Sequence, residues 1–154
     1  MQTRFIELVT AFLAEAGIDI PVTPGENLVS VPLGNLNFHI GLFESRRAVI
    51  MQAVAGVLPV ADRSAFCEEL LRMNSLFRGT QGATFGLEDD AVTLQSFIPM
   101  DNISTEAFIE QAVAFLEAWL FVVKHFDEIA ARAGHEHDDT PDMDVSGIQN
   151  ILRI

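Results

Sequence analysis

The residues best suited to covalent catalysis in this sequence are one cysteine and two of the histidines. Cys67 could form a thiolate–imidazole pair with His39 or His125, an arrangement that activates a cysteine nucleophile. Cys67, however, lies beside the apolar stripe of a predicted helix, and a thiol in apolar surroundings stays protonated and unreactive. The pattern therefore favours a structural cysteine over a catalytic one.

Histidines and acidic residues near the end of the chain are of the kinds that ligate metal ions. His135 and His137 are followed by Asp138 and Asp139. Two histidines at i and i+2 converge poorly on a helix, and a segment expected to be flexible does not preorganise a site. We therefore expect at most adventitious zinc or nickel binding there. The acidic run 88–90 lacks the spaced oxygen ligands of a calcium loop, which indicates a solvated turn.

The glycines of the central region do not form a phosphate cradle. Gly79 and Gly82 belong to no GxxxxGK[ST] pattern that follows a strand and opens a helix, so they are better explained as a tight link between a helix and a strand. No catalytic, cofactor-binding or metal residue is predicted. The sequence thus indicates a protein that is not an enzyme, and a small-ligand enzyme or a metal-dependent hydrolase is the alternative from another class.

The charge balance narrows the range of partners. The chain has 154 residues, 49% of them hydrophobic, which is enough to fill one core. Acidic residues number 22 and basic residues 9, so the formal net charge is −13. Binding to nucleic acid or to an anionic membrane needs clustered lysines and arginines, and this chain has a single lysine, Lys124. An acidic surface instead favours solubility and fast encounter with a basic or amphipathic partner.

Cysteine usage and the N-terminal residues point to the cytoplasm. One cysteine cannot form an internal disulfide, as suits a reducing compartment. Glu7 and Glu15 interrupt the apolar run of residues 1–17, which is unlike a signal peptide. No uncharged apolar stretch of about 18 residues occurs, so no membrane span is expected.

The periodicity of apolar residues predicts one α+β domain. Helices are expected at 3–16, 62–77 and 104–133, and strands at 27–31, 36–43, 48–59, 83–87 and 91–98. The order αβββαββα predicts an antiparallel sheet packed with helices. We expect the domain to occupy residues 1–133 and an acidic, flexible tail to occupy residues 134–154, where 145–152 has helix-like apolar spacing.

Capping residues set the expected helix boundaries. Asp62 and Ser104 are placed to cap the second and third helices, and Gly134 is expected to end the third. The third helix carries two adjacent apolar seams, which would cover a sheet face better than a two-helix coiled coil. Phe121 lies outside both seams and is the apolar residue of that helix most expected to be exposed.

The sequence contains more large apolar residues than one helix-covered sheet obviously needs. The surplus comprises Phe12, Phe77, Phe97, Phe121 and the run 49–57. One interpretation is a generous core, since single exposed apolar residues are ordinary. The other is a self-association surface together with grooves for an extended partner. The pattern does not choose between these interpretations.

Residues 66–99 carry a resemblance to a known family. The segment LLRMNSLF closes the second predicted helix at Asn74, and GATFGLEDDAVTLQSFIP follows as a glycine-led strand, an acidic turn and a second strand. Together with the length, the acidity and the order of elements, these segments resemble the Tir chaperones, the CesT-like class I chaperones of bacterial type III secretion. The resemblance covers residues 3–132 and leaves the tail outside.

The resemblance implies a cytoplasmic homodimer that holds the N-terminal region of a secreted effector in extended form, soluble and ready for export. It also implies contact with the secretion ATPase. The implied dimer interface comprises Phe66, Leu70, Met73, Phe77, Ala83 and Phe85. The implied effector groove comprises Phe5, Leu8, Phe12, Leu28, Val29 and Phe38. The alternative of related fold is a YbjN-like regulatory or stabilising protein that does not serve secretion.

Overall fold

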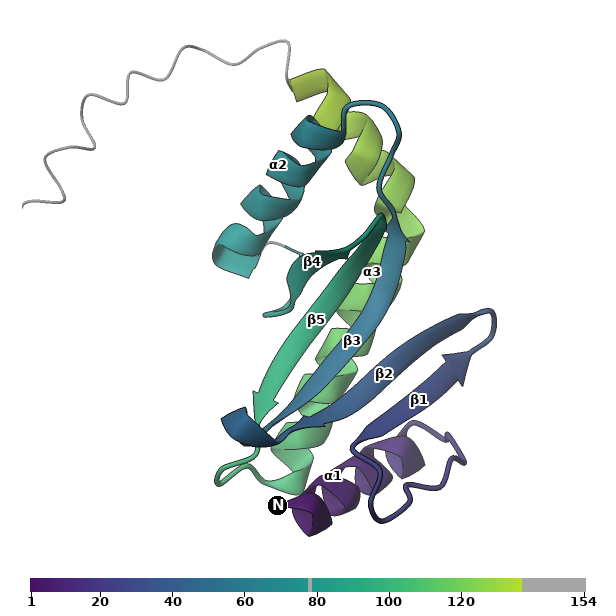
Figure 1. Cartoon of the computed structure of the whole chain (residues 1–154), viewed down its shortest axis with the longest axis vertical. Helices are drawn as coiled ribbons and strands as arrows, with labels where there is room; N and C mark the ends of the chain where they lie inside the picture. The colour runs from purple at the N-terminus through teal and green to yellow at the C-terminus, as the bar shows by residue number, and fades with distance from the viewer. Residues whose placement is uncertain (78, 137–154) are drawn as a thin grey trace, which may run out of the picture.

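The computed structural model describes residues 1–77 and 79–136, which form three α-helices and one five-stranded sheet (Figure 1). The α-helices are α1 (Gln2–Glu15), α2 (Arg63–Asn74) and α3 (Thr105–Glu136). The strands are β1 (Leu28–Leu33), β2 (Leu36–Phe43), β3 (Ala48–Val57), β4 (Thr84–Glu88) and β5 (Ala91–Pro99). Two short 3-10 helices, η1 (Glu44–Arg46) and η2 (Ser75–Phe77), follow β2 and α2. The predicted order αβββαββα is confirmed.

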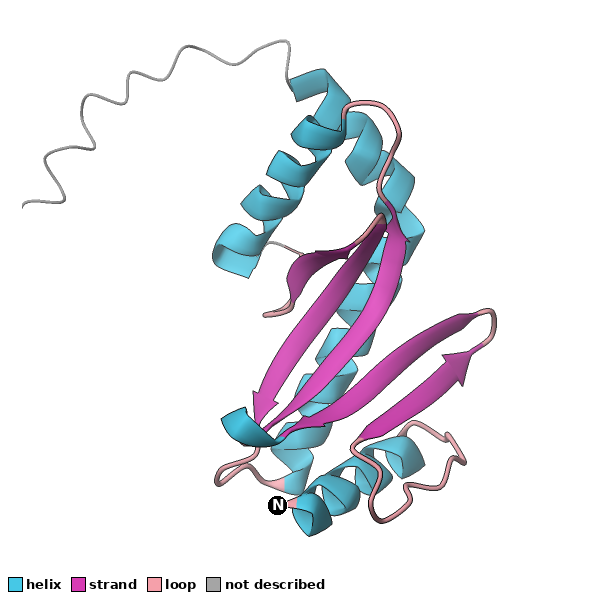
Figure 2. Ribbon diagram, viewed as in Figure 1, coloured by secondary structure: helices cyan, strands magenta, loops and turns pink. Residues whose placement is uncertain are grey.

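The strands form one antiparallel sheet in the order β1-β2-β3-β5-β4 (Figure 2). β1, β2 and β3 are consecutive neighbours, as expected of a meander, and β5 then pairs with β3 while β4 lies outside β5. The sheet therefore has two edges, β1 and β4. β4 is shorter than β5 and pairs only with residues 91–95 of it.

The core lies between one face of the sheet and the helices. α3 runs along that face behind the strands in Figure 1, and α1 and α2 pack against opposite ends of α3. Trp119, at the middle of α3, is fully buried and donates its indole N–H to the carbonyl of Val54 at 2.8 Å. Its ring meets Phe38 edge-on, and Phe38 meets Phe12 in the same way. These contacts join α1, the sheet and α3 into one core.

A close approach of α3 to the sheet explains one glycine. A Cβ on Gly56 would lie 2.5 Å from a ring carbon of Phe126, so no larger residue fits there without displacing that ring. Phe126 also contacts Phe66 edge-on, which ties α2 to the far end of α3. The strand pairing shifts between Val54 and Gly56, at the same place.

The predicted starts of α2 and α3 are confirmed, but the capping bond expected of Asp62 and the predicted end of α3 are wrong. Asp62 has φ +53°, in the left-handed region, and its side chain makes no capping bond. A residue that caps through its side chain usually has extended backbone angles, and Asp62 does not adopt them. Gly134 does not end α3, because the helix continues to Glu136. Ser104 caps α3 as predicted, accepting the Ala107 N–H at 3.1 Å.

Other expectations concern exposure and membranes. Phe121 is exposed, as predicted. No helix among the described residues is long and apolar enough to cross a membrane. The expected tail falls for the most part on residues 137–154, outside the described residues.

Candidate partner-binding site

Most of the predicted interface residues are buried beneath the surface that α2 and β4 form. Five of the six are buried in the monomer, namely Phe66, Leu70, Met73, Ala83 and Phe85. Phe77 is half-exposed and lies in η2, beyond the end of α2, with φ +50°. The predicted stripe is therefore largely core, and other side chains form the surface above it.

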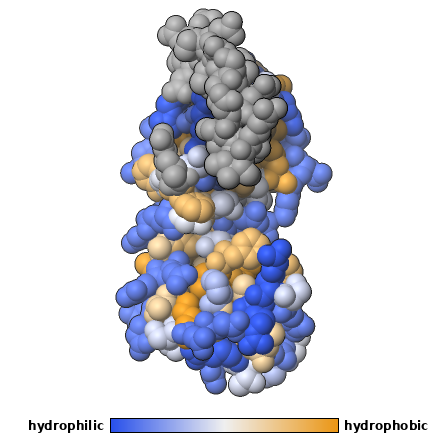
Figure 3. All heavy atoms as spheres, turned by 90° about the vertical axis from the view of Figure 1, so that its left-hand side faces the viewer, coloured by the Kyte–Doolittle hydropathy of each residue, from blue (hydrophilic) through white to orange (hydrophobic). Residues whose placement is uncertain are grey.

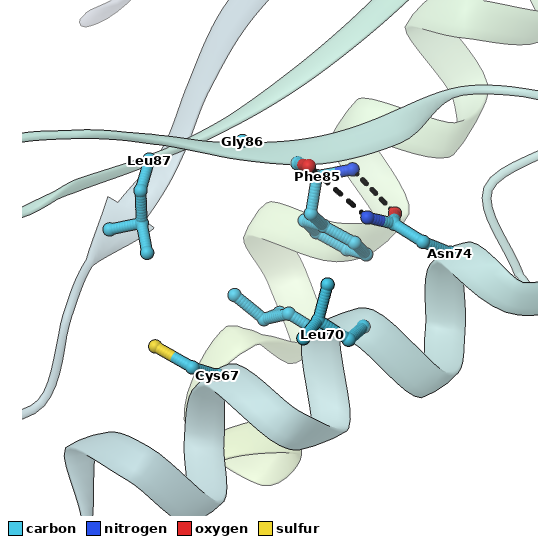
Figure 4. A pocket seen from close by; sticks show the side chains of 7 residues that line it. Cys67, Leu70, Asn74, Phe85, Gly86 and Leu87 are labelled. Atoms are coloured by element: carbon cyan, nitrogen blue, oxygen red, sulfur yellow. Dashed lines mark hydrogen bonds between the residues drawn. The ribbon is translucent and has the colours of Figure 1, made fainter.

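A small open pocket lies between α2 and β4 (Figure 4). Its volume is about 220 Å³, and its lining consists of Cys67, Leu70, Leu71, Asn74, Phe85, Gly86 and Leu87. Leu71 is 67% exposed and Leu87 45% exposed, which is unusual for leucines on neighbouring elements. The pocket is thus an apolar surface with a buried apolar floor.

Asn74 joins the end of α2 to β4, an arrangement that sequence reasoning missed (Figure 4). Its side-chain oxygen accepts the Phe85 N–H at 2.6 Å, and its side-chain nitrogen donates to the Phe85 carbonyl at 3.2 Å. The amide therefore pairs with β4 as a further strand would. The sequence signal for this contact is an asparagine at the end of an amphipathic helix, which by itself predicts only where the helix ends.

Backbone groups at the edge of β4 are therefore already hydrogen-bonded within the chain. Phe85 directs both its N–H and its carbonyl away from β5, toward Asn74. Two residues earlier, the Ala83 N–H donates to the Thr80 carbonyl at 2.9 Å. Backbone groups of an edge strand alternate in direction, so these residues belong to the outward-directed set. A partner strand could therefore not pair with Phe85, at the middle of the edge formed by residues 83–87.

At the other edge of the sheet, formed by β1, the outward backbone groups are not hydrogen-bonded in this way. The Leu42 N–H donates to the Asn27 carbonyl at 2.7 Å, which shows that Asn27 faces β2. By the alternation of an antiparallel pair, Leu28, Ser30 and Pro32 direct their backbone groups to the open side. Pro32 agrees with this register, because its missing N–H then costs no bond to β2. Within the described chain, no hydrogen bond closes this edge at Leu28 or Ser30.

Of the predicted groove residues, only one is available to a partner in the monomer. Phe5, Leu8, Phe12, Val29 and Phe38 are buried, with at most 4% of any side chain exposed. Leu28 is 59% exposed and lies at the start of β1. The groove itself stays a prediction, but five of its expected side chains serve as core between α1, the sheet and α3.

The residues with possible catalytic chemistry are not assembled into a site. His39 bonds to Ser30 through Nδ1 at 2.9 Å, and Nδ1 of His125 lies 2.9 Å from a Glu128 carboxylate oxygen. Within residues 1–77 and 79–136, no hydrogen bond joins Cys67 to either histidine. The same residues contain no group of three His, Cys, Asp or Glu side chains that could hold a metal ion. His137 lies outside the described residues.

Apolar side chains are also exposed on the face of the molecule that carries the sheet edge at β4 and β5. Figure 3 looks onto the left-hand side of Figure 1 and shows them gathered in its lower half, surrounded by hydrophilic side chains. Large hydrophobic residues with at least 45% exposure include Phe97 on β5 and Leu87 on β4. Surfaces of this kind are typical of proteins that bind other chains.

Solved structures share this fold at low sequence identity. A chain in the crystal structure of the ExsC–ExsE complex matches with a TM-score of 0.65 and 16% identity, covering 80% of this chain and 94% of that chain. The Yersinia pestis type III secretion chaperone SycH, in complex with a fragment of YscM2, matches with a TM-score of 0.58 and 16% identity, over 77% and 98% of the two chains. YbjN of E. coli matches with a TM-score of 0.55 and 11% identity, over 79% and 91%.

The sequence itself identifies the family. A comparison with curated proteins gives no match. The family model of the Tir chaperone protein (CesT) family matches residues 7–120, which include most of α1, all five strands, α2 and the first half of α3. The match covers well over half of the chain, and the antiparallel sheet with its helices agrees with the secretion-chaperone structures. This chain belongs to the Tir chaperone protein (CesT) family.

Proposed function

We propose that this protein is a cytoplasmic type III secretion chaperone. It binds the N-terminal region of an effector in extended form, which keeps the effector soluble and competent for secretion. The observation that carries the proposal is the family match over residues 7–120. The structural neighbours support it, because they include ExsC with ExsE and a secretion chaperone with a YscM2 fragment.

The open edge at β1 is the proposed site of effector binding. The outward N–H and carbonyl groups of Leu28 and Ser30 can pair with an extended segment, which then continues the sheet. The exposed Leu28 side chain offers an apolar contact beside that ladder. Main-chain pairing accepts many sequences, as a chaperone's binding surface requires, while neighbouring apolar contacts select among them.

The surface of α2 and β4 is the proposed interface of a homodimer. Leu71 and Leu87 would be buried between two copies, above the floor formed by Leu70 and Phe85. Phe77 is half-exposed in η2, directly after the C-terminal end of α2, and would extend the contact. A symmetric dimer buries the same patch on both copies, so one apolar surface is sufficient. The effector-loaded dimer is then the species presented to the secretion ATPase.

Co-expression with the effector encoded beside this gene tests the function. We expect the effector to become soluble, to co-purify with two chaperone copies by light scattering, and to remain protease-sensitive beyond the bound segment. Hydrogen exchange should slow at residues 28–30 in the complex. A monomeric chaperone, or an effector whose solubility and exchange do not change with it, would overturn the proposal.

The YbjN-like alternative rests on likeness of fold. Its TM-score of 0.55 is below that of the ExsC structure, at 0.65. The two functions differ in genomic position, because a dedicated chaperone is expected beside its effector or the secretion apparatus. They also differ in the co-expression result, since a protein that does not serve secretion leaves a neighbouring effector insoluble.

A further inference from the structure

The face of the sheet turned away from α3 carries two rows of side chains of opposite character. The strand register places Leu28, Gly41, Ile50 and Phe97 side by side on β1, β2, β3 and β5. The neighbouring row across all five strands is polar and consists of Ser30, His39, Gln52, Gln95 and Thr84. In Figure 1 no helix lies in front of β3 and β5, so this face is open there.

The side chains beside the glycine of the apolar row occupy the space that a larger residue would need. A Cβ on Gly41 would lie 3.0 Å from a methyl group of Ile50 and 3.5 Å from one of Leu28. Ile50 and Leu28 thus border the position above Gly41 and keep the row apolar there. Phe97 extends the row to β5, and its ring packs on Phe43 at a centroid distance of 5.9 Å.

The row ends in an open pocket of about 370 Å³ near η1. The lining residues are Phe43, Arg46, Ala48, Phe97 and Pro99. Both phenylalanines are between 40% and 48% exposed, so the pocket offers aromatic faces to solvent. It can hold one large apolar side chain of a partner, but is too small for a folded element.

Arg46 is the charged residue of this lining, on a chain whose net charge is −13. Arg47, one residue later, pairs with Asp101 at 2.7 Å, whereas no ion pair or side-chain hydrogen bond is found for Arg46 within the described residues. Glu44 begins the same turn and does not line the pocket. The pocket thus joins an apolar cavity to an available guanidinium.

We propose that this pocket and the apolar row bind an extended peptide segment that presents a large apolar side chain and, two residues later on the same face, a carboxylate. The apolar side chain fills the space between Phe43 and Phe97, and the carboxylate pairs with Arg46. A guanidinium binds a carboxylate through two parallel N–H groups, which adds direction to the apolar contact. The inference deepens the proposed function and rests on it, since it names the chemistry of an effector segment on the face beside the β1 edge.

Two matched peptides test the proposal with the full-length protein. The probes are acetyl-Gly-Ser-Leu-Phe-Ser-Asp-Gly-amide, with Phe and Asp on one face of the extended chain, and the same peptide with Asn in place of Asp. We expect both to shift the amide resonances of Ala48, Ile50 and Phe97 in a titration of ¹⁵N-labelled protein. At low salt the Asp peptide should bind roughly threefold to tenfold more tightly, as a partly exposed charged hydrogen bond allows. The preference should shrink in 0.5 M salt, since salt screens exposed charges.

Two arginine variants separate the specific contact from net charge. Arg46→Gln should remove the preference for the Asp peptide while both peptides still bind. Arg47→Gln removes the same charge one residue away, outside the pocket lining, and should keep the preference. Phe97→Ser should weaken binding of both peptides, and Phe43→Ser replaces it if the first variant has a lower melting temperature.

The remaining outcomes overturn the inference. These are shifts at millimolar peptide that lie elsewhere, equal affinities of the two peptides, or a preference that Arg46→Gln leaves intact. Failure here does not remove the proposed function, because effector solubility and exchange at residues 28–30 are measured without these peptides. A failure of the co-expression test would remove the function and leave a peptide site without its expected partner.

Discussion

The two edges of the sheet have the same backbone chemistry and opposite availability. At β4, Asn74 occupies the outward groups of Phe85, and the Thr80 carbonyl takes the N–H of Ala83. At β1, the outward groups of Leu28 and Ser30 have no partner in the described chain. An unprotected edge strand is a template for another strand, so proteins usually close such edges. Here one edge is closed at Phe85, whereas the other is left open at both Leu28 and Ser30.

The difference suggests that the two edges bind different kinds of partner. The β4 side offers side chains, with Leu71 and Leu87 exposed over a closed backbone. The β1 side offers backbone groups and one exposed leucine, Leu28. Side-chain packing suits a fixed partner such as a second copy, whereas backbone pairing suits a variable segment. Substitutions at each edge should therefore affect different associations.

The largest expected effect is on self-association. Leu71→Asp places a charge in the proposed interface and should weaken the dimer by roughly 3 kcal/mol or more, about a hundredfold in the dissociation constant. Analytical ultracentrifugation over a range of concentrations measures it. Val60→Asp is the matched control, because Val60 is 94% exposed in the loop before α2. An unchanged dissociation constant, or the same loss in the control, would contradict the proposed interface.

Opening the closed edge should reduce stability. Asn74→Ala leaves the N–H and carbonyl of Phe85 without their side-chain partner, so we expect the free energy of unfolding to fall by about 1–3 kcal/mol. Urea denaturation measures the change. Asn74→Asp keeps the acceptor for the N–H but sets a carboxylate oxygen against the Phe85 carbonyl, so it should also lose stability, and less of it at low pH, where the protonated acid can donate. Stability equal to that of the unchanged protein would show that Asn74 does not hold this edge.

Closing the open edge should reduce effector binding by a smaller amount. Ser30→Pro removes one outward N–H and no bond to β2, as Pro32 already does two residues later. We expect effector affinity to fall about threefold to tenfold, the value of one backbone hydrogen bond, with the dimer unchanged. Ser30→Ala keeps the N–H and should bind as before. Calorimetric titration with the effector's N-terminal peptide measures both, and equal affinities would place the bound strand elsewhere.

The smallest expected effect lies at a site away from both edges. The backbone N–H of Glu106 and then the Ser104 hydroxyl bond its carboxylate and lower its pKa. A carboxyl group whose pKa is lower in the folded than in the unfolded state stabilises the fold at pH values above its unfolded-state pKa. This contribution disappears as the pH falls through the folded-state pKa. Glu106→Gln should therefore lower the urea midpoint slightly at pH 6 and hardly at pH 3.

Comparison with Glu110→Gln, one turn further along α3, isolates this effect of the helix start. Neither substitution should change dimer or effector affinity. A pH-independent difference between Glu106→Gln and the unchanged protein would show that the charge of Glu106 does not contribute.

The sequence predicted the elements far better than the site. Alternation in β2 and the doubly apolar β3 identified a half-buried and a central strand, because period and composition report directly on burial of each face. Phe121 and Ser104 were also identified correctly. Phe5, Phe12 and Phe38 could not be assigned to groove or core, because an apolar residue looks the same in both. The role of Asn74 depends on its hydrogen bonds to Phe85 of β4, which lies 11 residues further along the chain.

By itself, then, the sequence determined the order of helices and strands, the acidic charge, and the family to which the chain belongs. These follow from local periodicity, composition and motif order, which need no knowledge of distant contacts. Only the tertiary structure decided which edge is closed, which leucines remain exposed, and which arginine is left beside a pocket. Each of these depends on how segments far apart in the chain meet, and a side chain's partners there are set by packing geometry.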